Sequence, residues 1–234
     1  MFRRIVTAAL VAGVIAGLLA TGLQMARVWP LILAAEEFEG AAPTQAHHHG
    51  ADPAVAAAHA AMTDAWAPED GLERMAYTLF FNLLAGFGFA LLVNAGLALR
   101  QAAGRPLSLT TGLLWGLAGF AAFALAPALG LPPELPGMPA ADLLERQLWW
   151  LATAVATLAG IALIALPRRI SLALLGALLI VLPHIIGAPH PDAGEASRVP
   201  PALAASFVTA SLATAAVFWA ALGALSGWLQ RSPR

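Results

Sequence analysis

The sequence predicts an all-α polytopic membrane protein with six transmembrane helices, or five if the weaker of its apolar runs does not span. Of its 234 residues, 60% are hydrophobic and 11% are charged, and the mean hydropathy is +0.77. Soluble domains carry about 25% charged residues. Apolar runs near the roughly 20 residues that a spanning helix needs recur along the whole chain, and the loops between them alternate in charge. We therefore expect residues 1–234 to form a single membrane domain.

The predicted spans follow one another with short connections. In order, they cover about residues 5–26, 75–99, 107–131, 147–166, 170–187 and 201–229. The first resembles a secretory signal, but its apolar run is long and the sequence from Gln24 to Arg27 is a poor cleavage site, so we interpret it as a helix. The fifth span, 170–187, is short. If only five spans cross, the first or the fifth is the one that does not. The tight turn at Arg168 and Arg169 predicts that the fourth and fifth helices are antiparallel neighbours.

The loop charges support both the count and an orientation. If the amino terminus is cytoplasmic, the cytoplasmic segments contain eight arginines and no acid, whereas the opposite segments contain all 13 acids and four arginines. This is the positive-inside pattern. It predicts cytoplasmic N- and C-termini and a periplasmic loop at residues 33–74, which holds eight of the acids and four of the six histidines.

Three pairs of glycines have the spacing that lets membrane helices approach closely. They are Gly13 with Gly17, Gly112 with Gly116, and Gly223 with Gly227. The spacing predicts tight helix crossings; the alternative is that glycine is simply common in membrane helices.

The histidines and acids suggest a divalent cation. Imidazole and carboxylate are ligands of borderline metals such as cobalt, nickel and zinc. His47, His48 and His49 lie on a loop, where they either capture a cation weakly or form a solvated tract. His59 falls on a short helix predicted after Asp52 and Pro53.

His184 lies at the outer end of the fifth predicted span. Pro183 removes a backbone donor beside it and Gly187 ends the helix soon after, so carbonyl groups should be free nearby. A polar residue at this depth is a functional candidate; the alternative is a histidine that is hydrogen-bonded at the interface.

Several classes of function are excluded or disfavoured. Cysteine is absent, which excludes disulfides, thiolate metal sites and cysteine nucleophiles. The chain has no phosphate-binding glycine-lysine loop, nucleophile elbow or His-Glu-x-x-His helix, so a membrane enzyme is not expected. No basic patch suggests nucleic acid. No carboxylate lies within a predicted span, which leaves the driving force open.

A set of short motifs in order along the chain resembles the CbtA family of predicted cobalt transporters. They are Gln24, Pro30-Leu31-Ile32, Ala35-Glu36, Phe38-Glu39, Glu73-Arg74, Leu131-Pro132-Pro133-Glu134, Pro136-Gly137, Arg146-Gln147, Trp149-Trp150 and the stretch Leu182 to Pro191. The resemblance implies a bacterial inner-membrane subunit without a cofactor, which brings in cobalt as its substrate for cobalamin synthesis. It also implies a small single-span partner, CbtB, that carries its own histidines.

When the family motifs are matched to positions in this sequence, further residues join the loop histidines as candidate metal ligands. The metal-site candidates are then His184, His190, Glu36, Glu39, Glu134, Gln24, His47, His48, His49 and His59. We expect a mouth formed by the first, third and fifth helices. Cobalt itself comes only from the resemblance, because these ligands rank divalent metals by a common order. The alternatives are an outer-face module that delivers metal to another transporter and a vitamin carrier.

Overall fold

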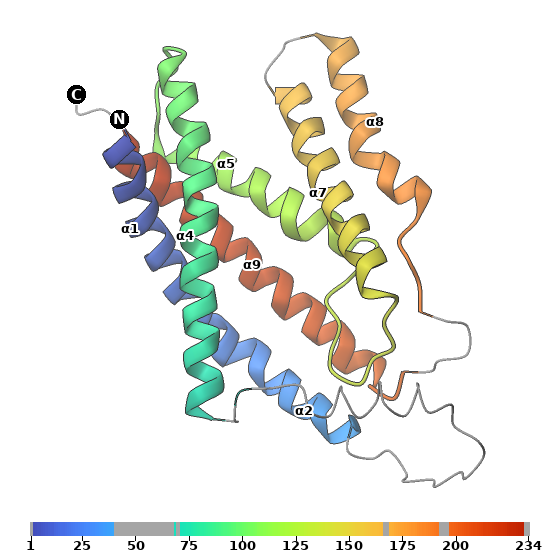
Figure 1. The fold of residues 1–234 in the computed structure, drawn as a ribbon. Helices are drawn as coiled ribbons and strands as arrows, with labels where there is room; N and C mark the ends of the chain where they lie inside the picture. Colours follow the sequence, from blue (N-terminus) through green and yellow to red (C-terminus); the bar gives the residue numbers. More distant parts are fainter. Residues whose placement is uncertain (1, 40–67, 69–70, 166–168, 192–196, 232–234) are drawn as a thin grey trace, which may run out of the picture.

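The computed structural model describes residues 2–39, 68, 71–165, 169–191 and 197–231, and all regular structure in these ranges is helical (Figure 1). The elements are α1 (Phe2–Leu23), the π-helical turn η1 (Gln24–Val28), α2 (Trp29–Glu39), α4 (Leu72–Ala102), α5 (Leu109–Phe120), the π-helical turn η2 (Ala121–Leu125), α6 (Ala126–Ala128), α7 (Leu143–Ala165), α8 (Ile170–Ile186) and α9 (Pro201–Gln230). The predicted all-α class is confirmed.

Five to six of these helices can cross a bilayer. Five helical segments are long and apolar enough, namely Phe2–Phe38, Leu72–Ala102, Leu109–Ala128, Leu143–Ala165 and Pro201–Gln230. The sixth, α8, is a largely apolar helix of 17 residues. At about 1.5 Å per residue it is about 26 Å long, slightly less than the hydrocarbon core of about 30 Å. The chain is therefore a multi-pass membrane protein.

The first helix runs further than the sequence predicts. We expected a span that ends near residue 26 and a loop from residue 33, but α1, η1 and α2 form one continuous helix up to Glu39. Pro30 does not end it, because the π-helical turn closes just before it, with the Trp29 N–H bonded to the Gln24 carbonyl. A widened turn gives the proline ring room where it would otherwise clash with the preceding turn. The second π-helical turn, η2, likewise ends two residues before Pro127.

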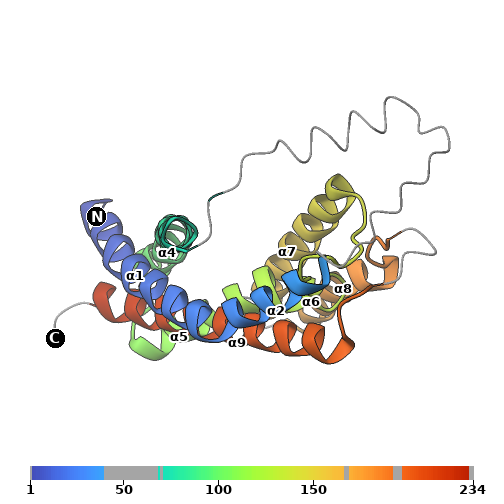
Figure 2. The ribbon, with the colours of Figure 1, turned by 90° about the horizontal axis from the view of Figure 1, so that it is seen from below.

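The helices form a four-helix body and an attached hairpin. α1 packs along α4, α5 packs along α9, and α9 also contacts α1 and α4. α7 and α8 pack mainly on each other, and α7 reaches the body through η2 and α6. Figures 1 and 2 both show the α7–α8 hairpin at the opposite end of α5 from α4. The predicted antiparallel neighbours therefore form a unit with few contacts to the rest of the described chain.

The predicted glycine crossings are confirmed. A Cβ atom added to Gly13 would lie 2.7 Å from backbone atoms of Gly86 on α4. One added to Gly112 would lie 2.2 Å from the Gly223 carbonyl oxygen, so α5 and α9 touch through their backbones. α7 and α8 touch in the same way, since a Cβ at Gly160 would lie 2.5 Å from the carbonyl oxygen of Gly176. Small residues thus set the helix spacing, as expected where the hydrophobic effect does not hold helices together.

A buried aromatic cluster joins α4, η2 and α9 at the centre of the body. The rings of Phe123 and Trp219 stack with 5.5 Å between centroids, and Phe89 lies 4.8 Å from Trp219. Trp219 is only 4% exposed. The cluster also contacts the α7–α8 hairpin, because the ring centroid of Phe123 lies 6.1 Å from that of Trp150 on α7.

The two ends of the molecule differ in charge. One end holds the start of α1, the α4–α5 connection, the end of α7, the start of α8 and the end of α9 (Figure 1). The described charged residues there are Arg3, Arg4, Arg100, Arg105, Arg169 and Arg231, and the described residues include no acid at this end. The other end, formed by α2, the start of α4, residues 130–145, residues 187–191 and residues 197–200, holds the described acids. We call these the arginine end and the acidic end.

A buried polar network closes the arginine end. Asn94 of α4 donates to Ser226 Oγ at 2.8 Å, and Gln230 Nε2 donates to the Asn94 backbone carbonyl at 2.9 Å. Arg4 donates to the carbonyl oxygens of Gln230 and, at 2.7 Å, of Arg231. The first and last described helices are thus tied together at this end, which keeps both ends of the described chain on one side.

Candidate metal-binding sites at the acidic end

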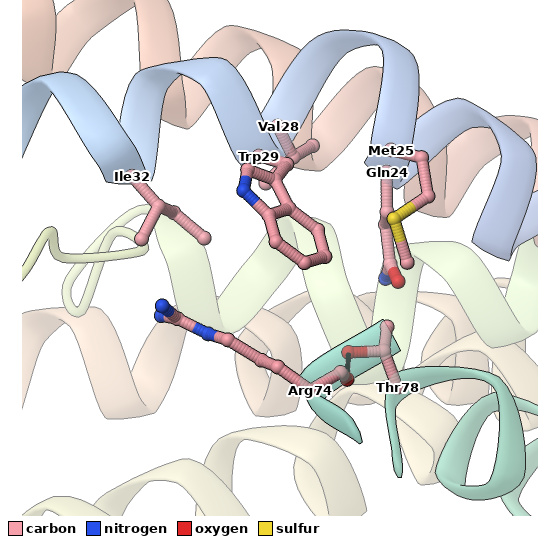
Figure 3. Close-up of a pocket in the computed structure, with 7 residues that line it drawn as sticks. All are labelled: Gln24, Met25, Val28, Trp29, Ile32, Arg74 and Thr78. Carbon is pink, nitrogen blue, oxygen red and sulfur yellow. Dashed lines mark hydrogen bonds between the residues drawn. The ribbon is translucent and has the colours of Figure 1, made fainter. Parts of the chain in front are cut away.

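A small cavity lies between the first helix and the start of α4. Its volume is about 230 Å³, and Figure 3 shows the side chains around it, which come from η1, α2 and α4. They are Gln24, Met25, Val28, Trp29, Ile32, Arg74 and Thr78. The cavity has room for several water molecules, or for a cation that keeps part of its hydration shell.

Gln24 lies on the widened turn η1 and forms part of a polar group with α4. Asn82 Nδ2 donates to Gln24 Oε1 at 2.6 Å and to Thr21 Oγ1 at 3.0 Å. Thr21 in turn donates to the Gly17 carbonyl at 2.9 Å. The predicted ligand Gln24 therefore already uses its oxygen within the protein, and a cation would have to share or replace the Asn82 contact.

Glu36 lies further along the same helix and is paired with an arginine of α4. Arg74 Nη1 lies 2.9 Å from Glu36 Oε1, and each of the two side chains is 31% exposed. The guanidinium of Arg74 also stacks over the Trp29 ring at 5.8 Å from its centroid. The carboxylate beside the cavity is therefore neutralised by a cation that the protein itself supplies.

Glu134 is paired in the same way. Arg146 Nη2 of α7 lies 2.7 Å from Glu134 Oε2, so the turn at residues 131–134 is tied to the first turn of α7. The next residue, Leu135, is buried in a hydrophobic cluster that also contains Ala35, the residue before Glu36. The two carboxylates thus border one cluster at the acidic end, although each faces its own arginine.

His184 is held against α7. Its ring meets Trp149 edge-to-face with 5.8 Å between centroids, and Trp149 Nε1 donates to the Pro183 carbonyl at 3.3 Å. α8 then ends at Gly187, whose φ of 92° favours glycine. The Nε2 atom of His184 is buried and has no hydrogen-bond partner. An imidazole nitrogen in that state is available to an incoming donor or metal ion.

The predicted ligands do not meet in one mouth. In the described ranges, no three His, Asp or Glu side chains lie close enough to hold a metal. Gln24 and Glu36 gather at α4, whereas Glu134 and His184 lie at the start of α7. His190 is exposed beyond α8, and Glu39 is the last residue of α2. His47, His48, His49 and His59 lie outside the described residues. The metal-ligand assignment stays a prediction.

The arginine partners of the two carboxylates could not be predicted from the sequence. Arg74 and Arg146 stand in the motifs above, but nothing in their sequence positions shows that they face Glu36 and Glu134. The cavity-lining Met25 and Thr78 were not predicted either. The signal for the cavity was Pro30, because a proline inside an apolar run indicates a local widening of the helix.

The arrangement offers carboxylate and amide oxygens, an imidazole nitrogen and the thioether sulfur of Met25 at one end of a membrane protein. Such mixed and exchangeable ligands suit a divalent cation that is captured and released, rather than a resident cofactor. No cysteine completes a structural metal site.

Comparison with known protein families agrees with this interpretation. The family model described as "Probable cobalt transporter subunit (CbtA)" matches residues 2–231, nearly the whole chain. No curated protein and no solved structure matches it. A transporter subunit is not an enzyme, in line with the missing catalytic motifs. From the bundle of apolar helices and this match, we conclude that the chain belongs to the CbtA family of probable cobalt transporter subunits.

Proposed function

We propose that this protein is the membrane subunit of a divalent metal uptake system in the bacterial inner membrane. It takes cobalt at the acidic end, which faces the periplasm, and passes it toward the cytoplasm for cobalamin synthesis. The observation that carries this proposal is the separation of charge in the described chain, with acids at one end and only arginines at the other. A small single-span, histidine-bearing partner of the CbtB type completes the system.

Capture begins with an exchange of cations. The Glu36–Arg74 and Glu134–Arg146 pairs are partly exposed. Pairs of this kind contribute only about 0–1 kcal/mol, because water screens them and the side chains lose freedom. A divalent ion carries twice the charge of a guanidinium, so it displaces the arginine at small cost. The pairs therefore act as a reversible gate rather than as a barrier.

The membrane potential is a sufficient driving force. Moving one charge through 100 mV yields about 2.3 kcal/mol, and a divalent cation gains about twice that. No acidic side chain lies in the central turns of the described helices, so proton coupling through an intramembrane carboxylate has no support here.

Uptake of labelled cobalt, nickel and zinc into cells that lack other importers tests the proposal. We expect cobalt accumulation in cells that produce the chain together with the small partner. If the chain binds cobalt but accumulation equals that of empty cells with and without the partner, the protein is an outer-face module that delivers metal to another transporter, and the proposed uptake role is wrong.

Glu36→Gln should lower cobalt uptake about three- to tenfold at low metal concentration, since the variant keeps the size of the side chain and removes its charge. Initial uptake rates over a range of cobalt concentrations measure this effect. Glu37→Gln is the matched control, because Glu37 is the adjacent acid on the exposed side of α2. Equal losses in both variants would mean that only the overall charge of this end matters.

Reporter fusions test the orientation. A fusion at Gly104 in the α4–α5 connection should report a cytoplasmic position, and one at Gly137, in the turn between α6 and α7, a periplasmic one. The reverse pattern would place the acids in the cytoplasm and would exclude capture from the periplasm.

A further inference from the structure

The facing surfaces of α7 and α8 carry small and polar residues between larger ones. On α7, Trp149, Thr153 and Gly160 follow one another at spacings of four and seven and so share a face. On α8, Gly176, Ile180 and His184 repeat every four residues. Trp149 meets His184 at the acidic end, and Gly160 meets Gly176 nearer the arginine end. Because the two helices are antiparallel, Thr153 must lie between these two contacts.

Two threonines of α7 have buried hydroxyl groups without a partner. Thr153 is 0% exposed and Thr157 is 2% exposed, and neither Oγ1 atom makes a hydrogen bond. Thr157 lies one turn after Thr153, on the side of the same face that turns toward Ala154 and η2. Five other hydroxyl groups in the described helices bond to the carbonyl four residues earlier, namely those of Thr7, Thr21, Thr78, Ser206 and Thr209.

This local bond is available to a helical threonine and disturbs the helix only slightly. The two buried hydroxyls forgo it, although an unsatisfied buried hydroxyl is unfavourable. They therefore point to a ligand that is absent from the closed interface.

The same interface offers further lone pairs. After the two threonine hydroxyls, His184 Nε2 is the third buried polar atom of this hairpin that has no hydrogen-bond partner, and it lies at the acidic end of the interface. Pro183 has no N–H, so the carbonyl of Leu179, one turn earlier, lacks its helical donor. Imidazole, hydroxyl and carbonyl groups thus follow one another along the hairpin, and none of them carries a fixed negative charge.

We propose that the interface between α7 and α8 is the inward path of the cation, beginning at His184 and continuing past Thr153 and Thr157. The permeating species is a partly dehydrated divalent cation. The Gly160–Gly176 contact closes the path in this structure, and slight separation of the two helices opens it. This proposal rests on the proposed uptake function and names its route.

Neutral donors suit such a path. A series of hydroxyl and carbonyl oxygens replaces part of the hydration shell while binding weakly enough for the ion to leave. A carboxylate in the same place would hold a divalent cation more tightly. Because the hairpin contacts the body mainly through η2 and α6, α8 can shift relative to α7 without disturbing the glycine crossings of the body.

Cysteine accessibility tests the path without relying on transport. The chain contains no cysteine, so Thr153→Cys and Thr157→Cys each introduce a single thiol. We expect a positively charged methanethiosulfonate, added to vesicles at the acidic side, to label both thiols, and we expect Co²⁺ to slow the labelling. Thr214→Cys, at a buried threonine of α9 that is 6% exposed, and Val155→Cys, on the outer face of α7, are controls that should react slowly. Labelling of Thr153→Cys and Thr157→Cys no faster than that of these controls would overturn the proposal.

Isosteric substitution gives an independent readout. The double variant Thr153→Val, Thr157→Val should lower initial cobalt uptake about tenfold with an unchanged or higher melting temperature, and serine at both positions should restore most of the rate. Uptake at the parent rate together with a higher melting temperature would show that the hydroxyls are only unfavourable buried groups. If the parent chain itself moved no cobalt, the proposed function would fail, while the labelling would still decide whether this interface admits cations.

Discussion

Replacing Gly223 by valine is expected to prevent assembly of the four-helix body. A Cβ atom at this position would lie 2.4 Å from the Gly112 carbonyl oxygen and 2.6 Å from the Gly116 Cα atom. These are backbone atoms of α5, so no side chain can move aside to make room. α5 and α9 would have to separate, and the aromatic cluster around Trp219 would lose its contacts with them.

The cost should exceed about 4 kcal/mol, at the upper end of what single substitutions cause, because a whole helix interface is lost. Yield of folded protein in mild detergent and the melting temperature measure it. Gly88→Val is the matched control: Gly88 also lies in a membrane helix, but a Cβ there meets nothing within 4 Å. A Gly223→Val protein that melts with the parent would contradict the observed crossing of α5 and α9.

Replacing His184 by alanine is expected to lower cobalt uptake at least tenfold. The variant removes the one buried imidazole nitrogen without a partner in the described chain, at the point where the acidic end meets the α7–α8 interface. Stability should change little, since the ring makes one edge-to-face contact with Trp149 and no hydrogen bond that the Nε2 atom would lose.

Initial uptake rates, normalised to the amount of protein in the membrane, check this expectation. Ile185→Ala is the control, because the side chain of Ile185 is next to His184 in the sequence and is 70% exposed. Deletion of residues 47–49 should have a smaller effect, confined to low metal concentrations, as expected for a scavenging tract. Uptake at the parent rate by the His184→Ala variant would remove the central metal ligand of the proposed path.

Much of the fold follows from patterns that are local in the sequence. The apolar runs predict where helices lie, because a bilayer demands a helix of fixed length with all backbone groups bonded internally. The glycine spacings predict which helix faces touch. The end of the first helix does not follow from these patterns: the apolar run predicts an end near residue 26, but the π-helical turn before Pro30 lets the helix continue to Glu39.

The candidate sites depend on contacts between distant segments, which no local pattern reveals. Glu36 pairs with Arg74 across 38 residues, and its neighbour Glu37 does not share that pairing. Thr153 and Thr157 were indistinguishable from other threonines until the structure showed that their hydroxyls are buried and unbonded. His184 became a candidate because Pro183 and Gly187 mark a helix end, a signal that is local.

The most direct measurement of the central claim is Co²⁺ flux into vesicles that contain the purified chain and its small partner. A cobalt-sensitive dye enclosed in the vesicles reports Co²⁺ entry, and a potassium gradient sets the membrane potential. We expect flux from the acidic side when the arginine side is negative, and a flux several times lower when the potential is reversed or His184 is replaced. Binding of Co²⁺ at the acidic side without flux above that of empty vesicles at either potential would contradict this claim.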